Sequence, residues 1–219
     1  MKVVEIFPSI EGEGKRAGAL TTFIRLYGCN LNCSYCDTRY GCEGKSYTVM
    51  SVNEILDQCE YLKLKNITVT GGEPLIHPGI EELLKELVLK GYEINIETNG
   101  TTEPLHFGCE KEHWHGNIFY TMDYKCPSSG MEGHMNGNAL RSLSDNDVLK
   151  FVVGDRDDLD KALEVLETLA PSAQVYFSPV FDKIDPKEIV EYLIQKRLTK
   201  CRVQIQMHKV IWDPDERGV

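Results

Sequence analysis

Residues 20–38 read LTTFIRLYGCNLNCSYCDT, an apolar and β-branched run that leads directly into three closely spaced cysteines. The run predicts a β-strand, and Cys29, Cys33 and Cys36 follow it in a C-x3-C-x2-C pattern. Three thiolates are one ligand short of the four that close a zinc or 4Fe–4S site. A cluster held by this loop would keep one iron free, so its metal can take part in chemistry.

Three other interpretations of the cysteines are weaker. A disulfide framework suits a short secreted chain, whereas this chain has 219 residues and scatters its other cysteines. A zinc ribbon needs a second cysteine pair at matching spacing, which the sequence lacks. A redox C-x2-C pair would leave Cys29 without a role. The scattered cysteines are Cys42, Cys59, Cys109, Cys126 and Cys201.

Short β-branched runs alternate with amphipathic helical stretches along the whole chain. Alternating βα units predict a parallel sheet with right-handed crossovers. Six or seven strands are too few for a closed eight-stranded barrel. We therefore expect an α/β fold, a partial (open) TIM-like barrel with a mostly parallel six- or seven-stranded sheet, in a single domain over residues 1–219. The predicted strands are 20–27, 66–70, 92–97, 117–122, 148–153, 174–177 and 202–206, and the predicted helices are 51–62, 79–90, 159–169 and 186–196.

The informative motifs all follow predicted strands. The cysteine loop follows the strand 20–27, Gly-Gly-Glu-Pro at 71–74 follows the next, and Thr-Asn-Gly at 98–100 follows the one after. Asp-Tyr-Lys at 123–125 and Ser-Pro at 178–179 follow later strands. Functional groups of parallel α/β folds gather at the carboxyl ends of the strands. The motifs are therefore expected to meet in one site.

The amino-acid composition argues against some classes of binding partner. The formal net charge is −10, which argues against nucleic acids and anionic membranes as partners. Met1–Glu5 carries an acid where a signal peptide would be apolar, and no apolar run approaches the ~20 residues of a membrane span. We expect a cytoplasmic protein with reduced thiols that acts on a small molecule or a protein.

Two segments allow more than one interpretation. Residues 103–116 contain His106, Cys109, His113 and His115, which suggest either a second metal site or, as we favour, a variable surface loop. Residues 126–138 are rich in Gly, Ser and Asn and suggest a mobile or lid-like loop.

The cysteine pattern and Thr70 to Pro74 (TGGEP) together resemble the radical S-adenosylmethionine enzymes. That resemblance implies a 4Fe–4S cluster whose free iron is chelated by S-adenosylmethionine. Gly71 and Gly72 would let the backbone approach the methionyl part, and Glu73 would accept from its ammonium group. Tyr35 would lie near the adenine. Taken alone, Gly-Gly-Glu-Pro would indicate only a tight turn.

Further motifs are similar to those of the 7-carboxy-7-deazaguanine synthase family. The resemblance covers about Phe7 to Pro214 and implies the ring contraction of 6-carboxy-5,6,7,8-tetrahydropterin to 7-carboxy-7-deazaguanine, with loss of ammonia and regeneration of S-adenosylmethionine. It also implies Mg²⁺, an electron donor such as flavodoxin, and a homodimer. The motifs are FPSIEGEG at 7–14, FIRLYGC at 23–29, YCDT at 35–38, IETNG at 96–100 and QMHK at 206–209.

Site residues carry over from this family by matching motifs. The substrate would contact Ile10, Glu11, Gly12, Arg25, Thr70, His208 and Pro214. S-adenosylmethionine would contact Tyr35, Cys36, Asp37, Gly71, Gly72, Glu73, Asp123, Tyr124, Lys125, Ser178, Pro179, Val180 and Phe181. Thr38 would offer its hydroxyl oxygen to Mg²⁺.

Alternatives remain open at several of these positions. Thr38 also suits a turn after the cysteines, and Arg25 also suits a structural ion pair. Glu11 stands where relatives often have Gln, and Asp123-Tyr124-Lys125 replaces a more usual Ser-Pro-Lys.

Two other functions compete at the level of the whole chain. A glycyl-radical activating enzyme would share the cluster and the Gly-Gly-Glu-Pro motif but would act on a protein. An iron–sulfur or zinc binding module would have a fully ligated site and no S-adenosylmethionine cleavage.

Overall fold

One curved sheet of nine strands runs through the computed structural model, which describes residues 1–44, 46–105 and 117–219. Its strand order is β3-β1-β2-β4-β5-β6-β7-β8-β9. The strands are β1 (Lys2–Ile10), β2 (Leu20–Leu26), β3 (Thr48–Val49), β4 (Asn66–Gly71), β5 (Glu93–Thr98), β6 (Ile118–Lys125), β7 (Val148–Val153), β8 (Gln174–Pro179) and β9 (Cys201–Val203).

The seven strands from β2 through β9, with β3 set aside, run parallel to one another and match the seven predicted strands. The expected fold class, an open TIM-like barrel, is therefore confirmed. Two strands were not predicted: β1 pairs antiparallel with β2, and the short β3 pairs antiparallel with β1. They extend the sheet at the edge next to the cysteine loop.

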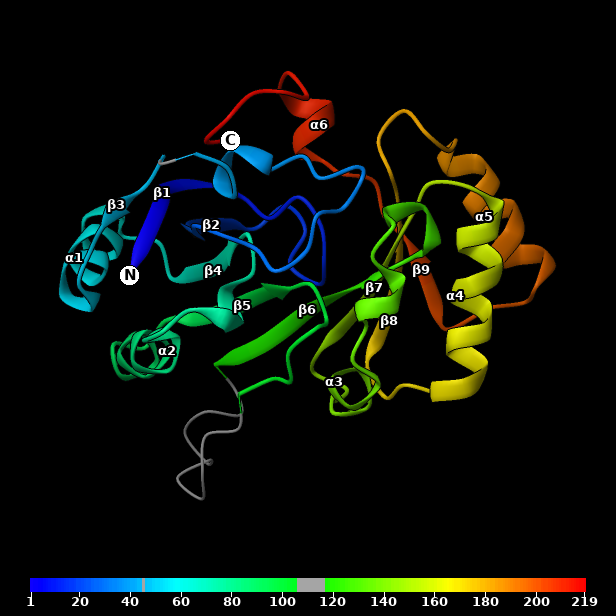
Figure 1. Cartoon of the computed structure of the whole chain (residues 1–219), viewed down its shortest axis with the longest axis horizontal. Coiled ribbons are helices and arrows are strands. Elements are labelled where there is room, and N and C mark those ends of the chain that lie inside the picture. The colour runs from blue at the N-terminus through cyan, green and yellow to red at the C-terminus, as the bar shows by residue number, and fades with distance from the viewer. Residues whose placement is uncertain (45, 106–116) are drawn as a thin grey trace.

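The helices cover the outer face of the sheet, and the strands form an arc that is open toward the opposite side (Figure 1). The α-helices are α1 (Val52–Leu62), α2 (Ile80–Leu89), α3 (Gly137–Arg141), α4 (Arg156–Leu169), α5 (Pro186–Gln195) and α6 (His208–Ile211). Short 3-10 turns are η1 (Arg39–Gly41), η2 (Pro74–Ile76), η4 (Pro127–Ser129) and η5 (Glu132–His134).

Local signals explain where the helices begin and end. Ser51 caps α1 in a capping box with Glu54, as its spacing predicts. Gly91 follows α2 with a φ of +82°, a conformation that glycine adopts without strain. Helix α4 begins at Arg156, three residues before its predicted start, because the Asp155 side chain accepts from the backbone N–H of Asp158.

The core lies between the helices and the outer face of the sheet. Leu83, Leu84 and Leu87 of α2 are completely buried, as are Ile67 of β4 and Ile94 of β5. Burying one such side chain stabilises the fold by about 1.5–3 kcal/mol. This packing fixes the strands, so the loops at their carboxyl ends have a rigid base. Of the helices in the described ranges, none combines the length and the apolar character that crossing a bilayer demands.

Candidate functional site

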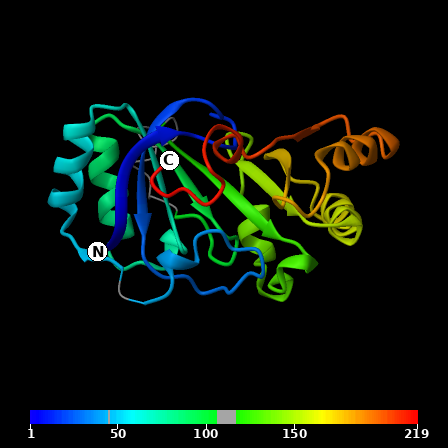
Figure 2. The same ribbon diagram turned by 90° about the horizontal axis from the view of Figure 1, so that it is seen from above.

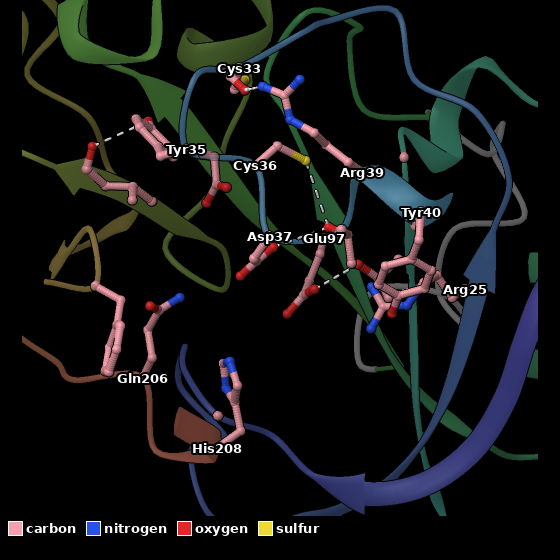
Figure 3. Close-up of a pocket in the computed structure, with 18 of the residues that line it drawn as sticks. Arg25, Cys33, Tyr35, Cys36, Asp37, Arg39, Tyr40, Glu97, Gln206 and His208 are labelled. Atoms are coloured by element: carbon pink, nitrogen blue, oxygen red, sulfur yellow. Dashed lines mark hydrogen bonds between the residues drawn. The ribbon is translucent and has the colours of Figure 1, made fainter. Parts of the chain in front are cut away.

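A cavity of about 1030 Å³ lies on the inner side of the open barrel, at the carboxyl ends of the parallel strands. Its wall includes the cysteine loop, the glycines after β4, and polar groups from β2, β5, β6 and β7. In Figure 3, Arg25 and Tyr40 lie together at one side of this space, and His208 and Gln206 lie across from Cys33 and Cys36. Single-ligand pockets usually hold about 300–1,000 Å³, so this cavity has room for more than one small molecule.

Cys29, Cys33 and Cys36 all line the cavity. Hydrogen bonds from the Cys42 thiol, the Leu31 N–H (3.4 Å) and the Asn99 amide (3.6 Å) lower the pKa of Cys29. Burial raises the pKa of Cys33. The loop therefore presents one thiol, Cys29, that ionises more easily than a free cysteine and one, Cys33, that ionises less easily.

The donor set fits a 4Fe–4S cluster better than a single ion. Within the described ranges, no three Cys, His, Asp or Glu side chains are close enough to surround one metal ion. A four-iron cluster places each thiolate on a different iron, so its ligands are spread around a cube and need not meet at a point. Three cysteines on one wall of a large cavity suit this arrangement.

Gly71 and Gly72 are required by packing against the cysteine loop. A Cβ on Gly71 would lie 2.1 Å from the Leu26 carbonyl oxygen, and one on Gly72 would lie 2.0 Å from the Gly28 carbonyl oxygen. The Gly72 N–H donates to Leu26 (3.0 Å) and the Glu73 N–H donates to Gly28 (2.9 Å). The turn after β4 and the start of the cysteine loop are thus joined backbone to backbone, and both glycines still face the cavity.

The Glu73 side chain does not line the cavity. It is fully buried and accepts hydrogen bonds from the Leu75 N–H (3.0 Å), the Thr98 hydroxyl (2.8 Å) and the Asn99 N–H (2.7 Å). Burial raises its pKa to about 7. Glu73 therefore joins the loop after β4 to the loop after β5, and its carboxylate is already satisfied by protein donors.

Arg25 lines the cavity from β2 and forms an ion pair with Glu5 of β1, with Nε 2.6 Å from Oε1. The Tyr40 hydroxyl donates to the same Glu5 oxygen at 2.8 Å. Arg25 thus has a structural partner and still faces the cavity, and its contact with a substrate carboxylate stays a prediction.

A buried network of charged side chains forms another part of the cavity wall. Lys150 of β7 lies 3.0 Å from Glu13 and 3.1 Å from Asp123, and Lys125 lies 2.8 Å from Asp123. Burial opposes the charge on Lys150, but the surrounding carboxylates hold its pKa well above the usual range. Sequence reasoning did not select Lys150 or Glu13. The lysine inside the otherwise apolar run VLKFVV is the sequence signal that could have identified Lys150.

Glu97, at the end of β5, also lines the cavity and was not selected from the sequence. It accepts from the Thr70 hydroxyl at 2.7 Å. Enclosure by protein raises its pKa to about 7. Near neutral pH, Glu97 can thus bind a proton or release it, next to Thr70 and opposite His208 (Figure 3).

Residues 11–19 connect β1 to β2, and we call them the floor loop. Because the two strands are antiparallel and Ile10 pairs with Leu20, this loop lies at the amino end of β2, opposite the cysteine loop. Gly12 lines the cavity, but the Glu11 side chain turns away from it. Glu11 is 1% exposed and pairs with Arg16 at 2.7 Å. Arg16 also donates to the Ile67 and Glu93 carbonyl oxygens, at the starts of β4 and β5. Any contact of Glu11 with a ligand would have to use its backbone.

Residues 204–219, which we call the C-terminal segment, run from β9 back toward β1 and the cysteine loop (Figures 1 and 2). His208 and Pro214 line the cavity. Burial lowers the pKa of His208, so its imidazole is neutral at pH 7. Lys209 lies 3.4 Å from Asp37 of the cysteine loop. The Thr38 hydroxyl donates to Asp37 at 3.1 Å and lies 4.0 Å from the Cys36 sulfur.

The remaining predicted positions fall into two groups. Tyr124 is buried against Phe151 on the outer side of β6, because neighbouring residues of a strand face opposite sides. Ser178 and Pro179 are also buried, and Ser178 donates to Glu13. The positions that do line the cavity are Ile10, Tyr35, Asp37, Thr38, Thr70, Asp123, Lys125, Val180 and Phe181.

Residues 126–138 form η4 and η5 beside the cysteine loop. The Ser34 N–H donates to Ser129 at 3.0 Å, and the Ser34 hydroxyl donates to Ser128 at 2.7 Å. The segment expected to be lid-like therefore supports the cysteine loop from outside. The histidines and Cys109 of residues 103–116 that suggested a second metal site lie in the range 106–116, outside the described residues.

Comparisons with known proteins agree with this geometry. Residues 23–107 match the radical SAM superfamily. The chain is 44% identical over 222 residues to a 7-carboxy-7-deazaguanine synthase of Clostridium acetobutylicum, covering 100% of this chain and 99% of the relative. It is 40% identical to one of Methanospirillum hungatei, covering 98% and 86%. The crystal structure of QueE from Escherichia coli has a TM-score of 0.76 and 25% identity, with 94% of each chain covered.

Proposed function

Since the chain belongs to the 7-carboxy-7-deazaguanine synthase family of radical S-adenosylmethionine enzymes, we propose that it converts 6-carboxy-5,6,7,8-tetrahydropterin to 7-carboxy-7-deazaguanine with loss of ammonia. The chain is accordingly a lyase of 7-deazapurine and queuosine biosynthesis, with a 4Fe–4S cluster and S-adenosylmethionine as cofactors. The substrate, the contacts below and the added ion are the proposed part.

One observation supports the substrate most directly. A single cavity contains the cysteine loop on one side and, on the other, Arg25, Thr70, Glu97 and His208. Arg25 offers a cation to a carboxylate, while Glu97 and the neutral His208 offer donors and acceptors to the edges of a bicyclic ring. A carboxylated pterin has these two features.

When bound, the cluster and S-adenosylmethionine supply the radical that takes a hydrogen atom from the substrate. The chain's own residues bind, orient and exclude water. Tyr35 and Phe181 offer apolar surface to the adenosyl part, and Lys125 places a buried positive charge beside Asp123. Glu97, with its pKa near 7, holds the proton that ring rearrangement and ammonia release require to move.

We place Mg²⁺ at Thr38 and Asp37. Their oxygens are 3.1 Å apart, both residues line the cavity, and Mg²⁺ prefers oxygen ligands. The substrate carboxylate would complete part of the remaining coordination shell. Thr38→Ala should raise the Mg²⁺ concentration that half-maximal turnover needs, while the visible absorption of the cluster stays unchanged. A lost cluster would instead make Thr38 a structural residue.

Three further expectations concern the cellular setting. The single continuous sheet supports a single domain over residues 1–219. Cluster ligands must be reduced thiolates, which favours the cytoplasm. An electron donor such as flavodoxin and a homodimer follow from the family alone.

The decisive experiment is turnover by the anaerobically reconstituted protein. With the carboxylated tetrahydropterin, S-adenosylmethionine, a reductant and Mg²⁺, we expect the deazaguanine acid to appear by mass spectrometry. Cys33→Ala should abolish cluster loading and product. Cys201→Ala, on β9, is the matched control and should keep both. A fully loaded wild-type protein that makes no product would reject the substrate assignment.

Arg25→Gln tests the carboxylate contact separately. Loss of a charge-assisted contact costs about 1.5–3 kcal/mol, so the KM for the pterin should rise about tenfold or more. Arg141→Gln, on the distant α3, is the matched control. An unchanged KM in Arg25→Gln would mean that its pair with Glu5 is its whole role.

A further inference from the structure

The first part of the C-terminal segment is firmly attached to the floor loop. Gln204 and Gly14 exchange two hydrogen bonds, of 2.7 and 2.8 Å. The Met207 N–H donates to the Gly12 carbonyl oxygen at 3.2 Å. The His208 ring lies so close to Gly12 that a Cβ there would be 2.3 Å from its Nδ1 atom. The segment therefore starts its course over the cavity from a fixed point.

The rest of the segment is held by a few side-chain contacts. Lys209, whose side chain is 11% exposed, pairs with Asp37, whose side chain is 49% exposed. The guanidinium of Arg217 lies over the ring of Tyr40, 4.0 Å from its centre. Pro214 and all five residues after it line the cavity. An exposed cation–π contact is weak, so residues 214–219 can open and close without disturbing the fold.

Arg217 reaches the same wall as Arg25. The two guanidinium groups lie 4.0 and 6.0 Å from the centre of the Tyr40 ring. Arg25 already shares its charge with Glu5, so an anion at Arg25 also meets a carboxylate. Across residues 1–44, 46–105 and 117–219, by contrast, no carboxylate lies within ion-pair distance of Arg217. Arg217 is thus the cation on this wall whose charge is not balanced by a paired acid.

We propose that Arg217 is a substrate-binding residue. The C-terminal segment closes over the cavity and brings the Arg217 guanidinium beside Tyr40, where it recognises the anionic group of a planar heterocyclic substrate together with Arg25. The identity of the anionic group as the pterin carboxylate rests on the proposed function.

An equilibrium binding measurement with ligands that are not turned over tests this role of Arg217 independently of catalysis. Oxidised 6-carboxypterin and pterin are fluorescent, are not turned over, and differ only in the carboxylate. We titrate each into the cluster-free full-length protein and follow fluorescence anisotropy. Wild type should bind 6-carboxypterin more tightly than pterin. Arg217→Gln should raise the Kd of 6-carboxypterin about tenfold or more, in the range of one charge-assisted contact, and leave the Kd of pterin within about twofold.

Two variants control for folding and for stacking. Arg141→Gln removes an exposed arginine far from the cavity and should change neither Kd. Arg217→Lys keeps the charge but loses the flat guanidinium, so it should recover part of the preference for 6-carboxypterin. A chain that ends at Pro214 should behave like Arg217→Gln.

Each alternative outcome has a distinct meaning. Equal losses for both ligands in Arg217→Gln would make Arg217 only a fastening for the segment and would overturn the proposal, as would an unchanged Kd for both. If wild type does not prefer 6-carboxypterin over pterin, the carboxylated substrate itself is wrong, and the proposed function falls with the inference. A wild-type preference that survives Arg217→Gln would leave the proposed function intact and reject the inference alone.

Discussion

The floor loop and the C-terminal segment close one cavity from two ends, yet they are held in opposite ways. The floor loop is anchored by the buried pair of Glu11 and Arg16, which binds the starts of β4 and β5. The far part of the C-terminal segment is held by the half-buried pair of Lys209 with Asp37 and by the exposed contact of Arg217 with Tyr40. A charge buried without its partner is costly, whereas an exposed pair contributes little. The site therefore has a fixed base and a cover that can open.

The largest expected effect comes from removing Arg16. Arg16→Ala leaves the Glu11 carboxylate buried without its cation, and breaking such a pair costs about 3–5 kcal/mol. Urea unfolding of the cluster-free protein should report a loss of this size. Arg39→Ala, whose side chain is 45% exposed, is the control and should cost under about 1 kcal/mol. Equal losses of unfolding free energy in Arg16→Ala and Arg39→Ala would show that the buried pair of the floor loop contributes no more than an exposed side chain.

Glu73 is a buried carboxylate that belongs to neither region, and its ionisation tests what burial alone costs. Glu73 has a folded-state pKa of about 7, raised from 4.5. Between these values the folded state binds more protons than the unfolded state, so the contribution of Glu73 to stability is complete below pH 4.5 and is lost as the pH rises to about 7. The full change is about 3 kcal/mol.

Glu73→Gln cannot ionise, so its free energy of unfolding should fall less steeply over this pH range than that of wild type. Glu97 has a similarly raised pKa, so part of the decrease in unfolding free energy with pH remains in both wild type and Glu73→Gln. Identical slopes for Glu73→Gln and wild type would show that Glu73 is ionised throughout.

The smallest effect is expected in the cover. Lys209→Ala removes the pair with Asp37, whose carboxylate is 49% exposed and stays hydrated without its partner, so the expected cost is about 1 kcal/mol. Thermal or urea unfolding should barely change, while amide exchange in residues 206–214 should accelerate. A loss of more than 2 kcal/mol of global stability would mean that the C-terminal segment is part of the rigid fold.

The parallel strands and the cavity-facing cysteines were predictable because hydrophobic periodicity and strand-end placement are local signals. Strand β1 was missed because Pro8 interrupts its pattern. Beyond Val3 no described strand pairs with the outer edge of β1, and prolines are tolerated on such edges.

The site was less predictable where a residue's direction depends on distant partners. Motif matching placed Glu11 beside the substrate, but Arg16 and the buried amide of Asn95 hold its carboxylate outside the cavity. Tyr124 faces the helices for a reason that strand alternation could have supplied. Lys150 is held in the cavity wall by Glu13 of the floor loop and Asp123 of β6, which are distant from it in the sequence.

The backbone contact between Gly71–Gly72 and residues 26–28 has a practical consequence for engineering. Because neither segment leaves room for a side chain between them, the cysteine loop and the turn after β4 form one transplantable unit. A chimaera that exchanges only one of them with a distant homologue would inherit a steric conflict at their junction. Successful grafts should carry both segments, together with the strand register that aligns β2 with β4.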